Sequence, residues 1–328
     1  MALRYDAGTA YLHAAPMFHL ADGCSSFAVT MCAGRHVFLP RFEPVAFRRL
    51  VRDQAVTDST IVPTMMAALV NDPAATPADY ASLRRLYYGA APMPEATIRR
   101  ALALLPQVKF QQAWGMTELS PIGCTIEPRY SVVDGPDAGR LASCGKPVSS
   151  VELRILDAVG REVPRGTVGE IAVRGPTVMQ GYWNRPAETA EALRGGWMHS
   201  GDAAYMDEQG FVFIVDRLKD MIVSGGENVY SAEVENAISL LPGVAEVAVV
   251  GVPDPRYGEA VHAIIVPRPG ARLDAEQVIA ACRERIAGYK CPRAVTFRAE
   301  PLPLSAAGKV LKAELRAPFW AGRESRLV

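Results

Sequence analysis

The sequence has 328 residues, and 49% of them are hydrophobic, enough to bury a large core and to form more than one domain. Acidic and basic residues balance at 35 each, which leaves no net field to attract nucleic acid or anionic lipid. No apolar run reaches the roughly 18 residues that a bilayer-spanning segment needs, and the N-terminus lacks the pattern of a signal peptide. We therefore expect a cytoplasmic protein that neither binds nucleic acid nor crosses a membrane.

The six cysteines are scattered and show no C-x-x-C spacing, so we expect reduced thiols, mostly buried. The five histidines form no H-x-H or H-E-x-x-H pattern, and a zinc site is not predicted. The sequence leaves the oligomeric state open.

The first part of the chain alternates short apolar runs with helical patterns. Strands are predicted at "HVFLP", "STIVP", "LRRLYYG" and "VKFQQAWG", and helices at the segments that Pro44, Pro63 and Pro94 open. Repeated strand–helix–strand units favour a parallel sheet covered by helices.

The pattern changes near residue 130. Short strands with Gly- and Pro-rich turns ("VELRILD", "VGEIAVRG", "GFVFIVD") predict a smaller antiparallel or barrel-like part up to residue 217. Beyond it, "SAEVENAISLL" predicts a helix with Ser231 as its N-cap, followed by strands "VAEVAVVGV" and "VHAIIVP" and a second helix, "DAEQVIAACRERIA". We therefore predict an α/β parallel-sheet domain (1–129) with a β-rich subdomain (130–217), and a small α+β domain at 218–328.

Two loops that follow predicted parallel strands, "YYGAAPMP" and "WGMTE", are candidates for a ligand site, because ligands bind beyond the carboxyl ends of such strands. The small residues Gly89 to Ala91 let a planar ring lie against the backbone, and Glu118 offers a carboxylate for a hard cation. Taken singly, each loop is better explained as an ordinary turn, with Trp114 as a core tryptophan; the two loops together favour a ligand site.

Further along, "HSGD" is predicted to form a tight turn that carries Asp202, a carboxylate suited to the two hydroxyls of a ribose. In "DRLKD", Arg217 supplies a donor fork for ribose or phosphate oxygens. Gly225 and Gly226 in "SGGENVYSAEVE" permit positive φ, which suits a close backbone approach and equally a plain turn.

Together with "PLPLSAAGK" near the C-terminus, these motifs stand in the order and spacing of the adenylate-forming acyl- and aryl-CoA synthetases, relatives of luciferases and of peptide-synthetase adenylation domains. "PMFHLADG" also resembles the family's segment beside the acyl site. The resemblance covers nearly the whole chain, from about Tyr11 to about Leu315, and six motifs in order make it specific.

The resemblance implies roles for matching residues. Nucleotide and cofactor contacts are implied for Gly89, Ala90, Ala91, Trp114, Gly115, Met116, Asp202, Arg217, Gly225 and Gly226, the last two facing the pantetheine tunnel. Catalytic roles are implied for Thr117 near the α-phosphate, Glu118 as the Mg²⁺ ligand, His19 near the acyl carboxylate, and Lys309, which would reach the carboxylate and α-phosphate in one domain orientation. Lys219 matches the hinge about which the mobile C-terminal domain turns. His19 is equally consistent with a buried core histidine.

One departure is marked. The family's Ser/Thr/Gly-rich loop ending in a lysine, which holds the β- and γ-phosphates and precedes the "PMFHLADG" segment, has no counterpart here. We therefore expect an incomplete N-terminal domain and a chain that is catalytically incomplete by itself.

The resemblance implies an ATP-dependent acid–CoA ligase that acts through an acyl-adenylate, with ATP, Mg²⁺ and coenzyme A, on a small carboxylic acid. Apolar residues near the predicted site (Phe18, Met93, Met116) favour a fatty acid. The alternatives are an aryl or amino-acid adenylation enzyme and a non-catalytic nucleotide-binding relative.

Overall fold

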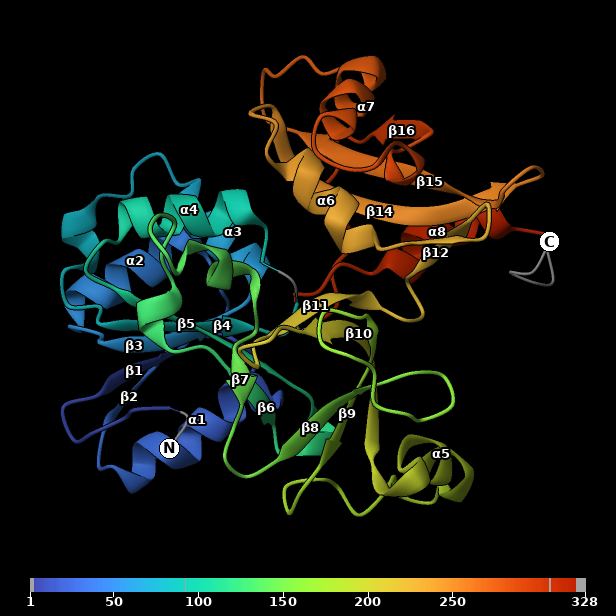
Figure 1. Ribbon diagram of the computed structural model, residues 1–328. Coiled ribbons are helices and arrows are strands. Elements are labelled where there is room, and N and C mark those ends of the chain that lie inside the picture. Colours follow the sequence, from blue (N-terminus) through green and yellow to red (C-terminus); the bar gives the residue numbers. More distant parts are fainter. Residues whose placement is uncertain (1–2, 92, 307, 323–328) are drawn as a thin grey trace. The chain divides into compact units, whose positions relative to one another are not determined.

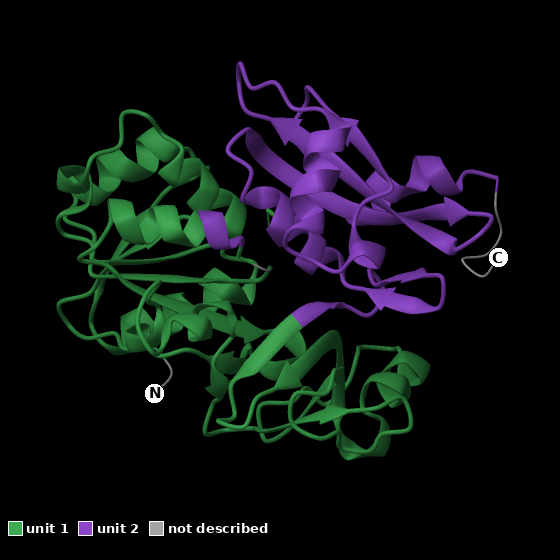
Figure 2. Ribbon diagram, turned by 45° about the horizontal axis from the view of Figure 1, so that its top comes forward, with its two compact units in different colours: residues 1–93, 97–214, 306–308 green, residues 94–96, 215–305, 309–328 purple. Residues whose placement is uncertain are grey.

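The computed structural model describes residues 3–91, 93–306 and 308–322, and the chain divides into two compact units. Unit 1 comprises residues 1–93, 97–214 and 306–308, and unit 2 comprises residues 94–96, 215–305 and 309–328 (Figure 2). The predicted domain boundary at residue 217 and the subdivision at residue 130 stay predictions.

Unit 1 contains a seven-stranded sheet in the order β2-β1-β3-β4-β5-β6-β7. Its strands are β1 (Ala10–His13), β2 (Arg35–Phe38), β3 (Asp58–Ile61), β4 (Arg85–Gly89), β5 (Lys109–Gly115), β6 (Ile122–Thr125) and β7 (Lys146–Pro147). Strands β1 to β5 pair in parallel, whereas β6 and β7 are antiparallel. The predicted parallel sheet is confirmed.

Helices cover both faces of this sheet. Helices α2 (Pro44–Asp53), α3 (Pro63–Val70) and α4 (Glu95–Leu104) lie on one face and α1 (Leu20–Met31) on the other (Figure 1). Pro44 and Pro63 open α2 and α3, and Pro94 directly precedes α4, since proline at the first turn removes an N–H that would have no partner there. The largest core cluster lies under α2–α4, around Phe47, Leu86 and Phe110.

A second, four-stranded antiparallel sheet has the order β11-β10-β9-β8. Its strands are β8 (Glu152–Leu156), β9 (Gly169–Arg174), β10 (Met198–Met206) and β11 (Val212–Arg217), and α5 (Pro186–Ala192) lies between β9 and β10 in sequence. The prediction that "HSGD" forms a tight turn is wrong. The motif lies inside β10, at a register shift between His199 and Ala203 where Gly201 has φ 72°. A β-bulge of this kind re-aims a side chain without ending the strand.

Unit 2 is built on β12 (Ile222–Ser224), β13 (Glu227–Val229), β14 (Val244–Asp254), β15 (Gly258–Pro267) and β16 (Ala294–Phe297), with α6 (Ser231–Ser239), α7 (Ala275–Arg283) and α8 (Lys312–Trp320). The predicted N-cap at Ser231 is wrong: Tyr230 is the N-cap, and Ser231 is the first helical residue. The Ser231 hydroxyl donates to Asp216 Oδ2 at 2.7 Å instead.

Short 3-10 helices complete the described chain, at η1 (Pro77–Tyr80), η2 (Thr117–Leu119), η3 (Pro128–Tyr130), η4 (Ala138–Ala142), η5 (Arg194–Gly196) and η6 (Gly288–Lys290). All six cysteines are free thiols, four buried and two half-buried, as expected. Among the described residues, no helix is both long enough and apolar enough to cross a bilayer.

Candidate active site

The candidate site in unit 1 starts at the carboxyl ends of β4 and β5, which are adjacent strands with Gly89 opposite Ala113. A Cβ on Gly89 would stand 2.1 Å from the Ala113 carbonyl oxygen, so only glycine fits there. Ala90 follows in the left-handed region, with φ 68°, a conformation that costs a non-glycine residue free energy. The backbone of the 89–91 loop is thus held close to the end of β5.

Trp114, the last large side chain of β5, is only 7% exposed. It packs in the core cluster that also contains Leu119 and Ile171. The burial of Trp114 agrees with the alternative of a core tryptophan. The indole has a further contact, because its Nε1 donates a hydrogen bond of 2.8 Å to Asp202 Oδ2.

This bond joins segments 88 residues apart in sequence. Asp202 is 6% exposed and lies in the β10 bulge, so a carboxylate predicted to contact a nucleotide is held against the end of β5. Burying a carboxylate is costly unless donors compensate it, and a hydrogen bond to an ionised group is among the stronger ones. Trp114 thereby fixes the orientation of Asp202, a role that the sequence did not predict.

Four further residues of the "WGMTE" motif follow Trp114. Gly115 ends β5, where a Cβ would stand 1.8 Å from the Pro121 carbonyl oxygen. Met116 is the N-cap of η2, which contains Thr117 and Glu118. Thr117 is exposed and Glu118 is half-buried, so both side chains reach the surface at the carboxyl edge of the sheet.

The Glu118 carboxylate accepts a 2.8 Å hydrogen bond from the Tyr182 hydroxyl. Burial and the neighbouring Glu118 carboxylate raise the pKa of Tyr182 to about 12, so the hydroxyl keeps the proton that it donates. The segment before Tyr182 is also tied to this loop, because Met179 N donates to the Glu118 carbonyl at 2.8 Å. No feature of the sequence singled out Tyr182.

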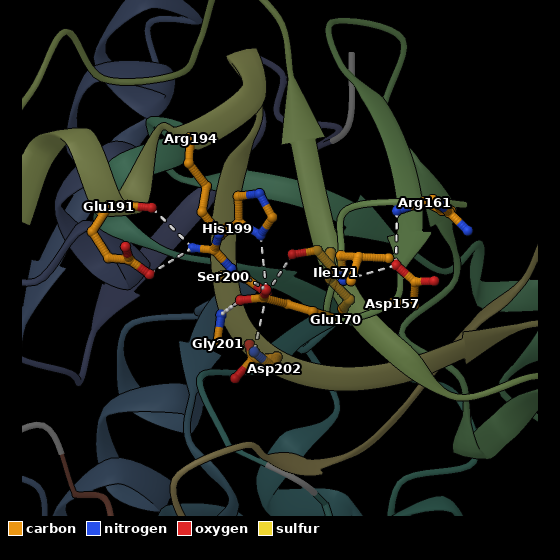
Figure 3. Close-up of polar contacts among 11 residues, drawn as sticks. Asp157, Arg161, Glu170, Ile171, Glu191, Arg194, His199, Ser200, Gly201 and Asp202 are labelled. Atoms are coloured by element: carbon orange, nitrogen blue, oxygen red, sulfur yellow. Dashed lines mark hydrogen bonds and ion pairs between the residues drawn. The ribbon is translucent and has the colours of Figure 1, made fainter. Parts of the chain in front are cut away.

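Glu170 on β9 is the centre of the contacts that hold the "HSGD" segment (Figure 3). Its carboxylate accepts from Gly201 N at 2.9 Å and contacts His199 Nδ1 at 2.7 Å and Arg194 Nη2 at 2.9 Å. The Ser200 hydroxyl donates to the Ile171 carbonyl at 2.8 Å and accepts from Asp202 N at 3.1 Å. The segment from His199 to the Asp202 N–H is therefore fixed by side-chain contacts.

The sequence analysis also missed Glu170. A signal existed, since Glu170 directly precedes the apolar run "IAV" in β9, and a largely buried carboxylate there needs a partner. Its partners come from the β10 bulge and from Arg194, and only the pairing of β9 with β10 brings them together.

Other predicted residues lie elsewhere in the chain. His19 is the half-buried N-cap of α1, with its ring centroid 4.6 Å from that of Phe18. Arg217 ends β11, and Lys219 lies in the turn that follows, closed by the Met221 N–H to Arg217 carbonyl bond of 3.0 Å.

In unit 2, Gly225 and Gly226 form the two-residue loop between β12 and β13, with φ of 62° and 84°. Two consecutive positive φ values are those of a type I′ hairpin turn, which glycine adopts without strain. Lys309 lies in a closed loop, where its carbonyl accepts from Ser305 N at 2.8 Å and its own N–H donates to Ser305 Oγ at 3.2 Å.

The described residues contain no group of three or more His, Cys, Asp and Glu side chains arranged to hold a metal ion. Glu118 nevertheless fits the usual Mg²⁺ site of nucleotide enzymes, in which one or two carboxylates and the substrate phosphates supply the ligands.

The fold defines a class of protein: two-unit α/β chains built on a parallel sheet, here with the candidate site beyond the carboxyl ends of β4 and β5. The chain belongs to the AMP-binding enzyme family. The family described as "AMP-binding enzyme" matches residues 1–183, and the family described as "AMP-binding enzyme C-terminal domain" matches residues 233–309. The resemblance to adenylate-forming acyl-CoA synthetases is confirmed.

Similar proteins include a feruloyl-CoA synthase of Amycolatopsis sp, 44% identical over 309 residues, which are 94% of this chain and 61% of the relative. The medium/long-chain-fatty-acid–CoA ligase FadD8 of Mycobacterium tuberculosis is 37% identical, covering 97% of this chain and 56% of the relative. The structure of ATP-bound MatB from Rhodopseudomonas palustris superposes with a TM-score of 0.87 at 33% identity, covering 96% of this chain and 61% of that one. This chain thus spans less than two thirds of the length of these relatives.

Proposed function

We propose that this chain forms part of an ATP-dependent acid–CoA ligase that acts through an acyl-adenylate. The observation that carries the proposal is the 2.8 Å bond from Trp114 to Asp202, which joins two motifs that the resemblance assigns to one nucleotide. The names of the relatives, CoA synthase and CoA ligase, support the same reaction class.

In this proposal the site binds adenosine first. The close backbone of the 89–91 loop receives the adenine ring, and Asp202 accepts hydrogen bonds from the ribose hydroxyls. Because the Trp114 indole donates to the Asp202 carboxylate and the Ser200 hydroxyl accepts from the Asp202 backbone N–H, the carboxylate is oriented before the ligand arrives. Preorganisation of this kind lowers the entropic cost of binding.

Activation of the acid then joins the acid carboxylate to the α-phosphorus of ATP and releases pyrophosphate. Two anions must approach each other, and charge builds on the phosphate as they react. Glu118 would hold Mg²⁺, which supplies positive charge to the phosphates, with the exposed Thr117 hydroxyl beside them. Lys309 would place its ammonium between the carboxylate and the α-phosphate in the adenylating orientation of the C-terminal domain.

In the second half-reaction the CoA thiol displaces AMP from the acyl-adenylate. The Gly225–Gly226 hairpin is the proposed wall of the pantetheine tunnel, since its left-handed turn carries no side chain to block a narrow passage. Lys219 is the proposed hinge between the two orientations.

For the acid, we propose an apolar carboxylic acid. Met17 and Phe18, exposed by 46% and 75%, precede His19 in the segment that resembles the acyl site. The relatives include ligases named for ferulate, for fatty acids and for indoleacetate. A fatty acid is our first candidate, and an aryl acid such as a cinnamate is the second, which the 44% identity to a feruloyl-CoA synthase favours.

The test uses acid-dependent ATP–pyrophosphate exchange in a chimera, in which the N-terminal portion of the Amycolatopsis relative precedes this chain. We expect exchange with fatty or cinnamic acids, and for the chain alone AMP binding in calorimetry with little exchange. A chimera that binds AMP but exchanges with no acid in the panel would favour the non-catalytic relative instead.

Lys309→Ala in the chimera should lower the adenylation rate by about 10²–10³, the usual loss for one electrostatic donor, and spare thioester formation from supplied acyl-AMP. Lys109→Ala, at an exposed lysine that starts β5, is the matched control and should change neither rate. Equal losses in both half-reactions would exclude the role proposed for Lys309.

A further inference from the structure

Unit 2 contains a largely buried charge cluster that the proposed mechanism does not use. Lys312, the first residue of α8, lies 2.6 Å from Glu235 Oε1 and donates to the Ser231 hydroxyl at 2.5 Å. The Ser231 hydroxyl in turn donates to Asp216 Oδ2 at 2.7 Å. The Lys312 and Glu235 side chains are 18% and 19% exposed, and Ser231 and Asp216 are buried. We call these four residues the α6–α8 cluster.

The α6–α8 cluster lies at one edge of the unit 2 sheet. β14 is an outer strand of that sheet, and its Val249 N–H donates to Glu235 Oε1 at 2.8 Å instead of to another strand. The Glu235 carboxylate therefore accepts from the edge of β14 as well as from Lys312, and it satisfies a backbone N–H that a sheet edge leaves unpaired.

Apolar packing holds α6 and α8 to opposite faces of β14. Helix α6 shares a core cluster with Val249, whereas α8 contributes Leu315 to a second cluster with Ala248 and Val250. Successive residues of a strand point to opposite faces of its sheet, so these apolar contacts attach each helix to β14 and not to the other helix. The bonds from Lys312 to Glu235 and Ser231 are what join α8 directly to α6.

The cluster also lies close to Lys309 in the chain, because Lys312 follows it by three positions. The Ser305 N–H donates to the Lys309 carbonyl at 2.8 Å, and the Leu311 N–H donates to the Pro303 carbonyl at 2.8 Å. These bonds join the two legs of the Lys309 loop to each other. Lys312 then bonds the end of the second leg to α6.

We propose that Ser231, Glu235 and Lys312 are positioning residues for Lys309 in the adenylation step. They fix the start of α8, and with it the loop that carries Lys309, relative to the rest of unit 2. The proposal rests on the proposed function, in which the Lys309 ammonium must lie between the acid carboxylate and the α-phosphate. A displacement of about 1 Å in such a group can lower a rate by roughly 100-fold.

The chemistry of the cluster suits it to fixing a position. Replacing a buried ion pair by apolar residues of similar volume often leaves a protein equally stable or makes it more stable, so stability alone does not call for charges here. Apolar contact is non-directional, whereas charge-assisted hydrogen bonds to a carboxylate and a hydroxyl hold an ammonium in one place. The position of α8 is therefore set by the charges more than by the apolar packing.

Asp216 is a member of the cluster that the proposal does not require. It stands before the proposed hinge, Lys219, and accepts from the Arg217 N–H at 2.8 Å. Ser231 and Lys312 stand after the hinge, as Lys309 does. A rotation at Lys219 thus carries the three positioning residues and Lys309 together as one body.

The first experiment measures both half-reactions in the chimera that carries the double replacement Lys312→Met, Glu235→Leu. Both charges are removed together, so no buried charge loses its partner and the urea midpoint should stay close to that of the unchanged chimera. We expect the adenylation rate to fall by roughly 100-fold and thioester formation from supplied acyl-AMP to be unchanged. A loss of stability alone would slow both half-reactions.

A second variant keeps both charges. Ser231→Ala removes the hydroxyl that accepts from Lys312, and it should lower the adenylation rate by about tenfold while sparing thioester formation. It tests the same positioning role if the double replacement fails to fold.

The double replacement Lys290→Met, Glu233→Leu is the matched control. This ion pair also joins α6 to another segment, with 2.7 Å between Lys290 Nζ and Glu233 Oε2, but its lysine lies in η6. The control should leave the adenylation rate unchanged, because η6 does not carry Lys309.

The second experiment needs no catalysis. It measures amide hydrogen exchange at Lys309 and Leu311, whose N–H groups are hydrogen-bonded, in residues 1–328 alone. The Lys312→Met, Glu235→Leu chain should exchange both amides about tenfold faster than the unchanged chain, since protection follows the free energy of local opening. The Lys290→Met, Glu233→Leu chain should exchange them at the unchanged rate.

Four results would overturn the proposal: an unchanged adenylation rate in the Lys312→Met, Glu235→Leu chimera, equal losses in both half-reactions, an equal adenylation loss in the control, or unchanged hydrogen exchange at Lys309 and Leu311. Failure of the proposed function gives a different result. If the unchanged chimera shows pyrophosphate exchange with no acid while the double replacement speeds hydrogen exchange in the loop, the ligase reaction is refuted and the positioning of the loop is supported.

Discussion

Replacing Trp114 by phenylalanine tests whether the indole N–H holds Asp202 in place. The change keeps an aromatic ring and removes one donor, the Nε1–H that lies 2.8 Å from Asp202 Oδ2. Both side chains are less than 10% exposed, so water cannot readily replace the lost bond.

The expected loss of stability has two parts. A hydrogen bond to a buried charged group contributes about 1.5–3 kcal/mol. The smaller ring also leaves a gap beside Gly123, whose backbone now packs so closely that a Cβ there would stand 2.5 Å from the indole. A cavity of that kind adds roughly 1 kcal/mol, for a total of about 2.5–4 kcal/mol.

Urea denaturation followed by circular dichroism measures this loss. With a denaturant slope of about 3 kcal/mol per M, the midpoint should fall by about 1 M. AMP affinity measured by calorimetry should fall as well, by roughly tenfold, because Asp202 must then be oriented by the ligand. Trp183→Phe, at a tryptophan that is 89% exposed, is the control and should change neither quantity.

A double-mutant cycle with Asp202→Asn separates the bond from the cavity. The coupling energy between the two sites should be about 1–2 kcal/mol, as expected for residues in direct contact. An unchanged urea midpoint and AMP affinity in Trp114→Phe would refute the reasoning, since the bond would then contribute neither to stability nor to the binding site.

Other changes test other parts of the chain. Lys312→Met should destabilise unit 2 by about 2–3 kcal/mol in urea denaturation, because the largely buried Glu235 carboxylate loses the Lys312 ammonium that lies 2.6 Å away. Adding Glu235→Leu should restore most of the lost stability. Burial lowers the pKa of His262, so His262 takes up a proton at a higher pH in the unfolded chain than in the folded one. The free energy of unfolding should therefore fall as the pH drops below 6.5, by at most about 1.4 kcal/mol per pH unit. If His262→Gln loses stability with pH just as steeply, His262 is not the cause. Lys219→Pro in the chimera should slow the coupled reaction more than either half-reaction assayed separately, and an unchanged coupled rate would place the hinge elsewhere.

The sheet of unit 1 illustrates what local pattern can predict. Two kinds of local signal predicted these elements: proline at the first turn of α2 and α3, and the apolar runs of β3, β4 and β5. Each of these elements lies where its signal predicts it. The order and spacing of the motifs likewise identified the family. These features depend on residues that are near one another in the chain.

Errors arose where a local signal competed with a distant partner. Ser231 has the side chain of an N-cap, yet its hydroxyl bonds Asp216, and the helix starts one residue earlier than predicted. The "HSGD" segment has the composition of a turn, but pairing with β9 keeps it extended as a bulge in β10.

By itself, the sequence determined the fold class, the family and most of the elements, because periodicity, prolines and glycines act over a few residues. Only the tertiary structure decided that Trp114 holds Asp202, that Glu170 holds the bulge, and that α1 presents phenylalanine and methionine on its outer side. Each of these depends on which distant segment lies opposite a side chain. A hydrogen bond across 88 residues leaves no trace in local spacing.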